Sequence, residues 1–161
     1  MKRLLLCLIA LCVILPTTNT VSAQDDGDFK FGFRTGYYFH TKAYGLGIYG
    51  TYGIAEWLNI EPGVNYIFKD KSSVDVYCDL QIPLEVATYW YIYPIVGLSV
   101  HDITSHGGSI DGWAGGINLG LGTTYNMNRR WSVNAQAKWM GRLPTKHANA
   151  VILSVGIDYN F

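Results

Sequence analysis

Residues 151–161, VILSVGIDYNF, alternate between two kinds of side chain. The odd-numbered positions are all apolar or aromatic, whereas the even-numbered positions include Ser154, Gly156, Asp158 and Asn160. Successive side chains of a strand point to opposite faces, so the stretch predicts a strand with one apolar and one mostly polar face. A soluble sheet would show the same alternation. The rest of the chain therefore has to indicate what the apolar face contacts.

The same two-residue alternation recurs along the chain, and no stretch after Ala23 shows helical periodicity. We predict eight strands separated by short turns, at residues 29–40, 44–54, 57–68, 74–88, 90–101, 113–125, 131–142 and 148–161. Each is long enough to cross a membrane as a tilted strand, which takes about 9–11 residues. The even number is typical of single-chain bacterial barrels.

The first residues read as an export signal. Lys2 and Arg3 precede an unbroken apolar run over residues 4–15, and a small-residue cleavage site ends at Ala23. The run is too short for a membrane-spanning helix, which needs about 20 residues. We expect residues 1–23 to be a cleaved signal peptide and residues 24–161 to form one domain.

Aromatic residues and glycine replace surface charge in this composition. The chain has 12 Tyr, 5 Trp and 18 Gly, and only 15% of its residues are charged, against about 25% in an average soluble domain. Without Lys2 and Arg3, ten basic side chains stand against twelve acidic ones, so no nucleic-acid partner is expected. Cys78 would be the only mature cysteine, which excludes an intramolecular disulfide.

The direction of the polar strand faces decides the architecture. Glycines and short polar residues suit the narrow lumen of a small barrel, and buried charges must be paired. We predict an interior charge network of Lys30, Arg34, Glu61, Asp79, Glu85, Lys138, Arg142 and Asp158. Tryptophans near strand ends predict an aromatic girdle of Trp57, Trp90, Trp113 and Trp131. The predicted fold is all-β, an eight-stranded antiparallel up-and-down transmembrane β-barrel; the alternative is a soluble periplasmic barrel with its apolar face inside.

The segments KFGFRTGYYF, LQIPLEVATYWYIYPIVGLSV, WAGGINLGLGTTY and VILSVGIDYNF together resemble the small outer-membrane β-barrel proteins. The sequence is similar to the porin-like "outer membrane protein beta-barrel domain" group common in Bacteroidetes-type bacteria. This resemblance implies an outer-membrane location, contact with outer-membrane lipid and recognition by the barrel assembly machinery. The assembly signal that it implies consists of Leu153, Val155, Ile157, Tyr159 and Phe161. We expect a monomer with both termini in the periplasm and four outward loops.

Three prolines depart from the pattern of a closed barrel. Pro62, Pro83 and Pro94 fall within the third, fourth and fifth predicted strands, where a missing N–H interrupts the ladder. All three lie toward the expected periplasmic end. We predict a bulge or fraying there.

Chemical motifs are sparse, so no catalytic residue, metal site or cofactor is predicted. His101, Asp102, His106 and Asp111 share one loop, but their spacing fixes no coordination geometry. Ser105, His106 and His147 form no recognisable Ser-His-acid arrangement. The leading hypothesis is a structural or envelope-associated, non-catalytic membrane protein with a side-chain-filled lumen and an unknown envelope ligand. The alternatives are a small porin-like channel or transport component and a lipid-A-modifying enzyme.

Overall fold

The computed structural model describes residues 28–68, 73–103, 112–143 and 149–161. Within these ranges no helix is long and apolar enough to cross a membrane. The strands are β1 (Phe29–Tyr38), β2 (Ala43–Ala55), β3 (Leu58–Phe68), β4 (Ser73–Gln81), β5 (Leu84–Ala87), β6 (Trp90–Ile103), β7 (Gly112–Asn126), β8 (Trp131–Leu143) and β9 (Ala150–Asn160).

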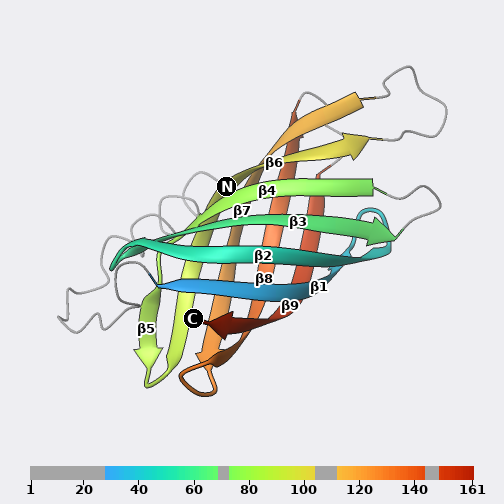
Figure 1. Ribbon diagram of the computed structural model, residues 1–161. Helices are drawn as coiled ribbons and strands as arrows, with labels where there is room; N and C mark the ends of the chain where they lie inside the picture. Colours follow the sequence, from blue (N-terminus) through green and yellow to red (C-terminus); the bar gives the residue numbers. More distant parts are fainter. Residues whose placement is uncertain (1–27, 69–72, 104–111, 144–148) are drawn as a thin grey trace.

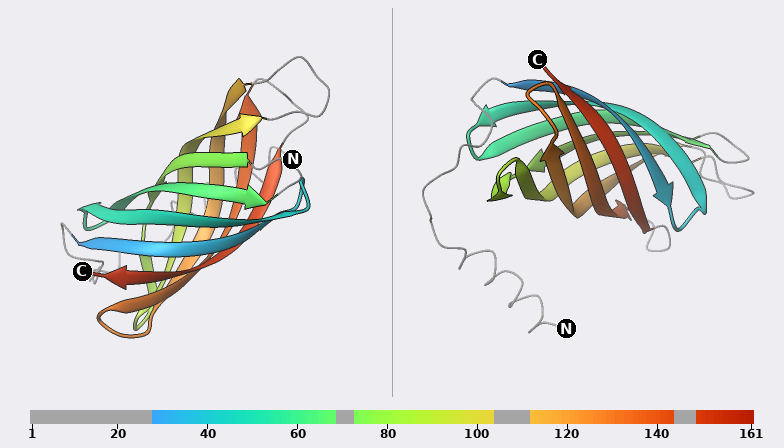
Figure 2. Two further views of the ribbon diagram at one scale, coloured as in Figure 1. Left: turned by 45° about the vertical axis from the view of Figure 1, so that its right-hand side comes forward. Right: turned by 90° about the horizontal axis from the view of Figure 1, so that it is seen from below.

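The sheet closes on itself. All pairings are antiparallel. Each joins strands that follow one another along the chain, except the pairing of β1 with β9, which closes the barrel, and that of β4 with β6. β4 and β5 face β6 in one register, with Gln81 opposite Ile95 and Leu84 opposite Ile92. They are two halves of one barrel strand, so the predicted eight-stranded up-and-down barrel is confirmed. In Figures 1 and 2 the strands on one side of the barrel, β1 to β4, cross those on the other side, β6 to β8, at a steep angle, as expected from strand tilt in a small barrel.

Most strand boundaries agree with the prediction to within two residues, but the predicted fourth strand, residues 74–88, is interrupted at Ile82 and Pro83. Ile82 N donates to Pro94 O at 3.4 Å. An antiparallel pair of this kind exchanges two hydrogen bonds, and Pro94 has no N–H to return the second. Two of the prolines therefore fall at one break in the wall.

Pro62 disturbs the pairing of β3 with β2. The paired residues run to Tyr49 opposite Gly63 and resume at Tyr52 opposite Ile60, in the same register. The interruption coincides with Pro62, while the pairing of β3 with β4 continues through it. The predicted bulge or fraying is thus found at Pro83, where the barrel strand is interrupted, whereas Pro62 and Pro94 lie inside continuous strands. The shifts of register fall instead between Gly53 and Ala55 and between Glu85 and Ala87.

The outer surface of the barrel is apolar around its circumference. Phe33 on β1, Leu46 on β2, Leu98 on β6, Leu121 on β7 and Val155 on β9 are each more than half exposed. The alternate positions turn inward, where charged side chains are buried. An apolar belt of this extent around the outside of a barrel is expected to contact an apolar solvent. The predicted inverted arrangement is confirmed.

The two ends of the barrel differ. We call the end where β1 begins and β9 ends the termini end, and the opposite end the loop end; in Figure 1 the C-terminus, β5 and the β7–β8 turn lie together at the termini end. Near the loop end an apolar cluster fills the lumen: Tyr38, Ala43, Ile67, Met140, Ala150 and Ile152. Polar side chains fill the middle, and a cavity occupies the termini end.

Candidate functional site

An ion pair crosses the middle of the lumen. Arg34 on β1 and Glu61 on β3 form two hydrogen bonds, Nη1 to Oε1 at 2.7 Å and Nη2 to Oε2 at 3.1 Å. Glu61 also accepts from Gln81 Nε2 at 2.7 Å, and Arg34 Nη1 donates to the Tyr77 hydroxyl at 2.9 Å. Both charged side chains are nearly inaccessible, with exposures of 4% and 2%. A bidentate pair with further polar partners is the arrangement that makes a buried charge tolerable.

A second ion pair lies beside the first. Lys138 Nζ on β8 is 2.9 Å from Asp79 Oδ2 on β4 and lies 4.0 Å from the centre of the Tyr77 ring. Asn118 Nδ2 donates to the other Asp79 oxygen at 2.8 Å, and Ser99 Oγ donates to Asn118 Oδ1 at 3.0 Å. Four strands, β4, β6, β7 and β8, thus share one network across the barrel. Tyr77 connects it to the Arg34–Glu61 pair.

Asp158 on β9 is held by neutral donors. The Tyr49 hydroxyl donates to Oδ1, and Asn134 Nδ2 donates to Oδ2 at 2.7 Å. The Tyr49 ring also lies against the Arg34 guanidinium, 3.8 Å from its centre to Arg34 Cζ. The three networks therefore form one polar layer.

Sequence reasoning missed the tyrosines that join these networks. Three of them lie opposite glycine on a neighbouring strand: Tyr49 opposite Gly32, Tyr77 opposite Gly63 and Tyr93 opposite Gly122. In each case a Cβ on the glycine would overlap the tyrosine ring. Glycine on the inward face leaves room for a ring lying flat across the wall. The sequence did contain a signal for their inward direction, because each tyrosine occupies one of the alternate positions that form the polar face of its strand.

The predicted interior network is brought together only in part. Arg34 with Glu61 and Lys138 with Asp79 form ion pairs, and Asp158 is buried beside them. Lys30 is half-buried in the wall of the cavity. The prediction that Glu85 belongs to the interior network is wrong. Glu85 lies in β5, a short strand beyond the break at Pro83, and all four residues of β5 are exposed. The side chain of Arg142 lies outside the described part of the chain.

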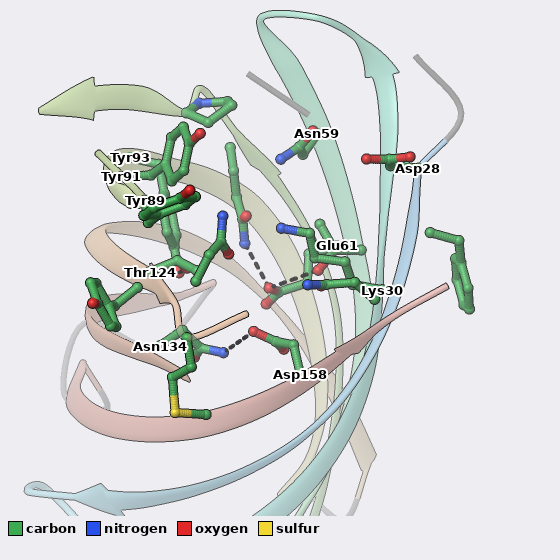
Figure 3. A pocket seen from close by; sticks show the side chains of 18 of the residues that line it. Asp28, Lys30, Asn59, Glu61, Tyr89, Tyr91, Tyr93, Thr124, Asn134 and Asp158 are labelled. Atoms are coloured by element: carbon green, nitrogen blue, oxygen red, sulfur yellow. Dashed lines mark hydrogen bonds between the residues drawn. The ribbon is translucent and has the colours of Figure 1, made fainter. Parts of the chain in front are cut away.

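The cavity at the termini end has a volume of about 690 Å³. Tyr89, Tyr91 and Tyr93 form one wall, and Lys30 and Asn59 lie on the facing wall (Figure 3). Glu61, Asn134 and Asp158 also line it. The lumen is therefore filled in the middle and near the loop end, but it is open toward the termini, which modifies the prediction of a side-chain-filled interior.

The predicted girdle tryptophans lie on the outer surface where they are described. Trp57, Trp90 and Trp131 are each at least 42% exposed and all lie at the termini end. The side chain of Trp113 lies outside the described part. At the loop end, Tyr37 stacks edge-on with Phe39 and Tyr44, with ring centres 5.1 and 5.0 Å apart. Exposed aromatic side chains thus occur at both ends of the apolar belt, as in membrane barrels.

The residues of the predicted assembly signal share the outer face of β9. Leu153, Val155 and Ile157 are exposed, and Tyr159 packs between Trp131 and Phe161 with ring centres 5.1 and 5.0 Å away. Phe161 N donates to Phe29 O at 3.1 Å, so the last residue still takes part in closing the barrel. Recognition by the assembly machinery stays a prediction.

No group of three or more His, Cys, Asp or Glu side chains in the described ranges is arranged to hold a metal ion. Ser105, His106, Asp111 and His147, together with the side chains of His101 and Asp102, lie outside those ranges. Their grouping is not tested by the structure.

Comparison with known proteins agrees with this architecture. The N-terminal β-barrel domain of Pseudomonas aeruginosa OprF superposes with a TM-score of 0.71 at 16% identity, covering 86% of this chain and 100% of that one. A major outer membrane protein of Thermus thermophilus gives a TM-score of 0.64 at 11% identity, covering 84% and 99%. Neisserial surface protein A gives a TM-score of 0.58 at 16% identity, covering 83% of this chain and 95% of that one.

These identities show the fold alone. No curated protein sequence matches the chain. The sequence does match the family described as "Outer membrane protein beta-barrel domain" over residues 9–161. The chain therefore belongs to this family and is an eight-stranded β-barrel protein of the outer membrane.

Proposed function

We propose that this barrel is a structural, envelope-associated protein without catalytic activity, and that its lumen does not conduct ions. The observation that carries the proposal is the polar layer in mid-barrel, where Arg34 pairs with Glu61 and Lys138 pairs with Asp79. An eight-stranded barrel is just wide enough for side chains to fill it or for one small ligand to fit inside. An ion crossing the lumen would have to displace both pairs.

The apolar cluster near the loop end adds a second obstacle. Its members, Tyr38, Ile67 and Met140 among them, are all at most 4% exposed. A passing ion would have to leave water to enter this region, at a cost of several kcal/mol. The two layers together favour a closed lumen.

The orientation and partners of the barrel are part of the same proposal. The termini and the turns beside them face the periplasm, and the loop end faces outward. Outer-membrane lipid contacts the apolar belt, the assembly machinery reads the outer face of β9, and the protein functions as a monomer. In the described part of the chain, the apolar belt exposes no charged side chain at mid-membrane that a second subunit would have to cover.

One observation favours a small pore as the second candidate. The 690 Å³ cavity opens at the termini end and has Glu61 in its lining, so it extends from that end to the polar layer. At the depth of the polar layer, the lumen would then open further if the Arg34–Glu61 pair moved aside. A conductance measurement separates the two candidates.

The test is single-channel recording of the refolded mature chain in planar bilayers, with heat-modifiable migration as the check of insertion. We expect no channel steps for the wild type, and larger leakage for Arg34→Ala/Glu61→Ala, which removes the pair. Lys30→Ala is the matched control, because Lys30 lines the cavity but lies outside the ion pair. Steady wild-type conductance would establish the pore instead.

The absence of catalytic activity is tested by mass spectrometry of lipid A from cells with and without the protein. We expect the lipid A masses to be the same in both.

A further inference from the structure

We propose that the cavity at the termini end binds a neutral saccharide, a unit or two of a glycan chain. This assignment goes beyond the structural role above and holds whether or not the lumen conducts. The cavity of about 690 Å³ lies within the range of small-molecule sites, about 300–1,000 Å³. It opens toward the termini and ends at the polar layer.

The two walls of the cavity present different chemistry. Tyr89, Tyr91 and Tyr93, from β6 and the turn before it, form an aromatic wall (Figure 3). Asn59 and Lys30 lie on the opposite wall (Figure 3). A pyranose ring has one C–H face that stacks on an aromatic ring and a rim of hydroxyls that donate and accept hydrogen bonds. An aromatic wall facing the amide of Asn59 and the ammonium group of Lys30 matches both features.

The charge of the lining argues against an anionic ligand. Its charged residues are Asp28, Glu61 and Asp158 against Lys30 and Arg129. Glu61 is already paired with Arg34, and Asp158 already accepts from Asn134 and Tyr49. The cavity therefore offers no excess positive charge of the kind that phosphate or nucleotide recognition needs.

Asn126 at the end of β7 lines the cavity, and its side-chain oxygen has no hydrogen-bond partner in the described part of the chain. This Oδ1 atom is buried. Buried polar atoms in folded proteins nearly always have a partner. A ligand hydroxyl can supply the missing donor once the carboxamide of Asn126 rotates toward the cavity that this residue lines.

The backbone of Tyr89 gives an independent indication. Tyr89 lies in the tight turn between β5 and β6 with φ of 68°, a left-handed conformation that glycine or asparagine adopts at lower cost. Asn126 N donates to Tyr89 O at 2.9 Å and holds the turn against β7. The side chain of Tyr89 is 61% exposed and lines the cavity, so burial does not account for its presence. A ring required for stacking does account for it.

The experiment titrates the refolded mature chain with N,N′-diacetylchitobiose, cellobiose and inorganic phosphate, measured by calorimetry. A polyoxyethylene detergent is used, because maltoside headgroups are themselves saccharides. We expect saturable binding of at least one disaccharide and none of phosphate. Preference for the acetamido sugar would indicate a cell-wall glycan, and preference for cellobiose an unmodified neutral glycan.

Tyr89→Gly is the decisive variant, because glycine removes the ring and relieves the backbone. It should fold at least as stably as the wild type and bind the disaccharide at least tenfold more weakly. Tyr89→Phe should retain most of the affinity. Tyr52→Ala, which removes an exposed tyrosine on the outer face, should bind normally. Absence of saturable saccharide binding, equal affinity in Tyr89→Gly, or binding of phosphate instead would each overturn the proposal.

Discussion

Asn118 and Leu119 are neighbours in β7 and lie in opposite environments. Asn118 is 1% exposed and donates to Asp79 inside the barrel, whereas Leu119 is 44% exposed on the outer belt. A strand alternates its side chains, so one residue of sequence separates the polar lumen from lipid. At this scale the effect of a substitution depends on the face and on the depth of the residue in the membrane.

Leu119→Arg should block assembly or strongly destabilise the barrel. An arginine facing lipid near the midplane costs about 2–4 kcal/mol, whereas near the interface it costs about 0–1 kcal/mol. Tyr125→Arg, on the same strand and face but at the termini end, is therefore the matched control. Heat-modifiable migration and urea unfolding in vesicles measure the difference. If Leu119→Arg behaves like Tyr125→Arg, the assignment of Leu119 to the membrane midplane is wrong.

Arg34→Leu should lower the free energy of unfolding by about 3–5 kcal/mol, because Glu61 is left as an unpaired buried charge. Arg34→Leu/Glu61→Leu should recover most of this loss, since both charges are then absent. Urea midpoints of the two variants in lipid vesicles give the comparison. An unchanged midpoint for Arg34→Leu would show that water reaches Glu61 and compensates for its charge.

At the scale of elements, neighbouring strands are held close by glycine at particular positions. Gly97 on β6 faces Asp79 on β4, and a Cβ there would lie 2.6 Å from Cys78 O and 2.7 Å from Asp79 Cα. These are backbone atoms, which cannot move without shifting β4. By contrast, Gly115 on β7 is exposed, and a Cβ added to it would meet no atom of another residue within 4 Å.

Gly97→Ala should therefore destabilise the barrel by about 1–3 kcal/mol, the usual cost of overpacking. Gly115→Ala should leave the free energy of unfolding unchanged within about 0.5 kcal/mol, as expected for a surface substitution. Both are measured by urea unfolding in the same vesicles. Equal stability of the two variants would show that β4 and β6 separate at little cost.

For the whole molecule, closure depends on the first and last strands. β1 pairs with β9 from Lys30 opposite Asn160 to Tyr38 opposite Ile152. Phe161 continues this contact through its backbone bond to Phe29 and a ring contact with centres 5.6 Å apart. Pairing of β1 with β9 leaves neither of these two strands with an open edge within the membrane, where unpaired backbone groups are costly.

Phe161→Ala should slow assembly in cells while leaving spontaneous folding into lipid vesicles nearly unchanged. The variant keeps the backbone bond to Phe29 and loses only the aromatic ring that we expect the assembly machinery to read. Phe33→Ala, which removes an exposed ring from β1, is the control. Surface levels in cells and folding rates in vesicles are compared. Normal surface levels of Phe161→Ala would show that the ring is not part of the signal.

The sequence by itself determined the number of barrel strands and the face of each side chain in them. Both follow from two-residue periodicity, which is a local property of the chain. It placed Arg34, Glu61, Asp79 and Lys138 on the inward face, and it indicated irregular pairing at Pro83. Parity carries no information about height along the barrel axis, and so it could not say which charges meet.

Only the tertiary structure decided the partners and the shape of the lumen. Asp79 and Lys138 are 59 residues apart and come together because strand tilt and register set their heights. Pro83 and Pro94 meet at one break, which leaves Glu85 in an exposed short strand instead of the interior. The cavity beside Tyr89 likewise depends on side chains from several strands, whose separation in space no local pattern encodes.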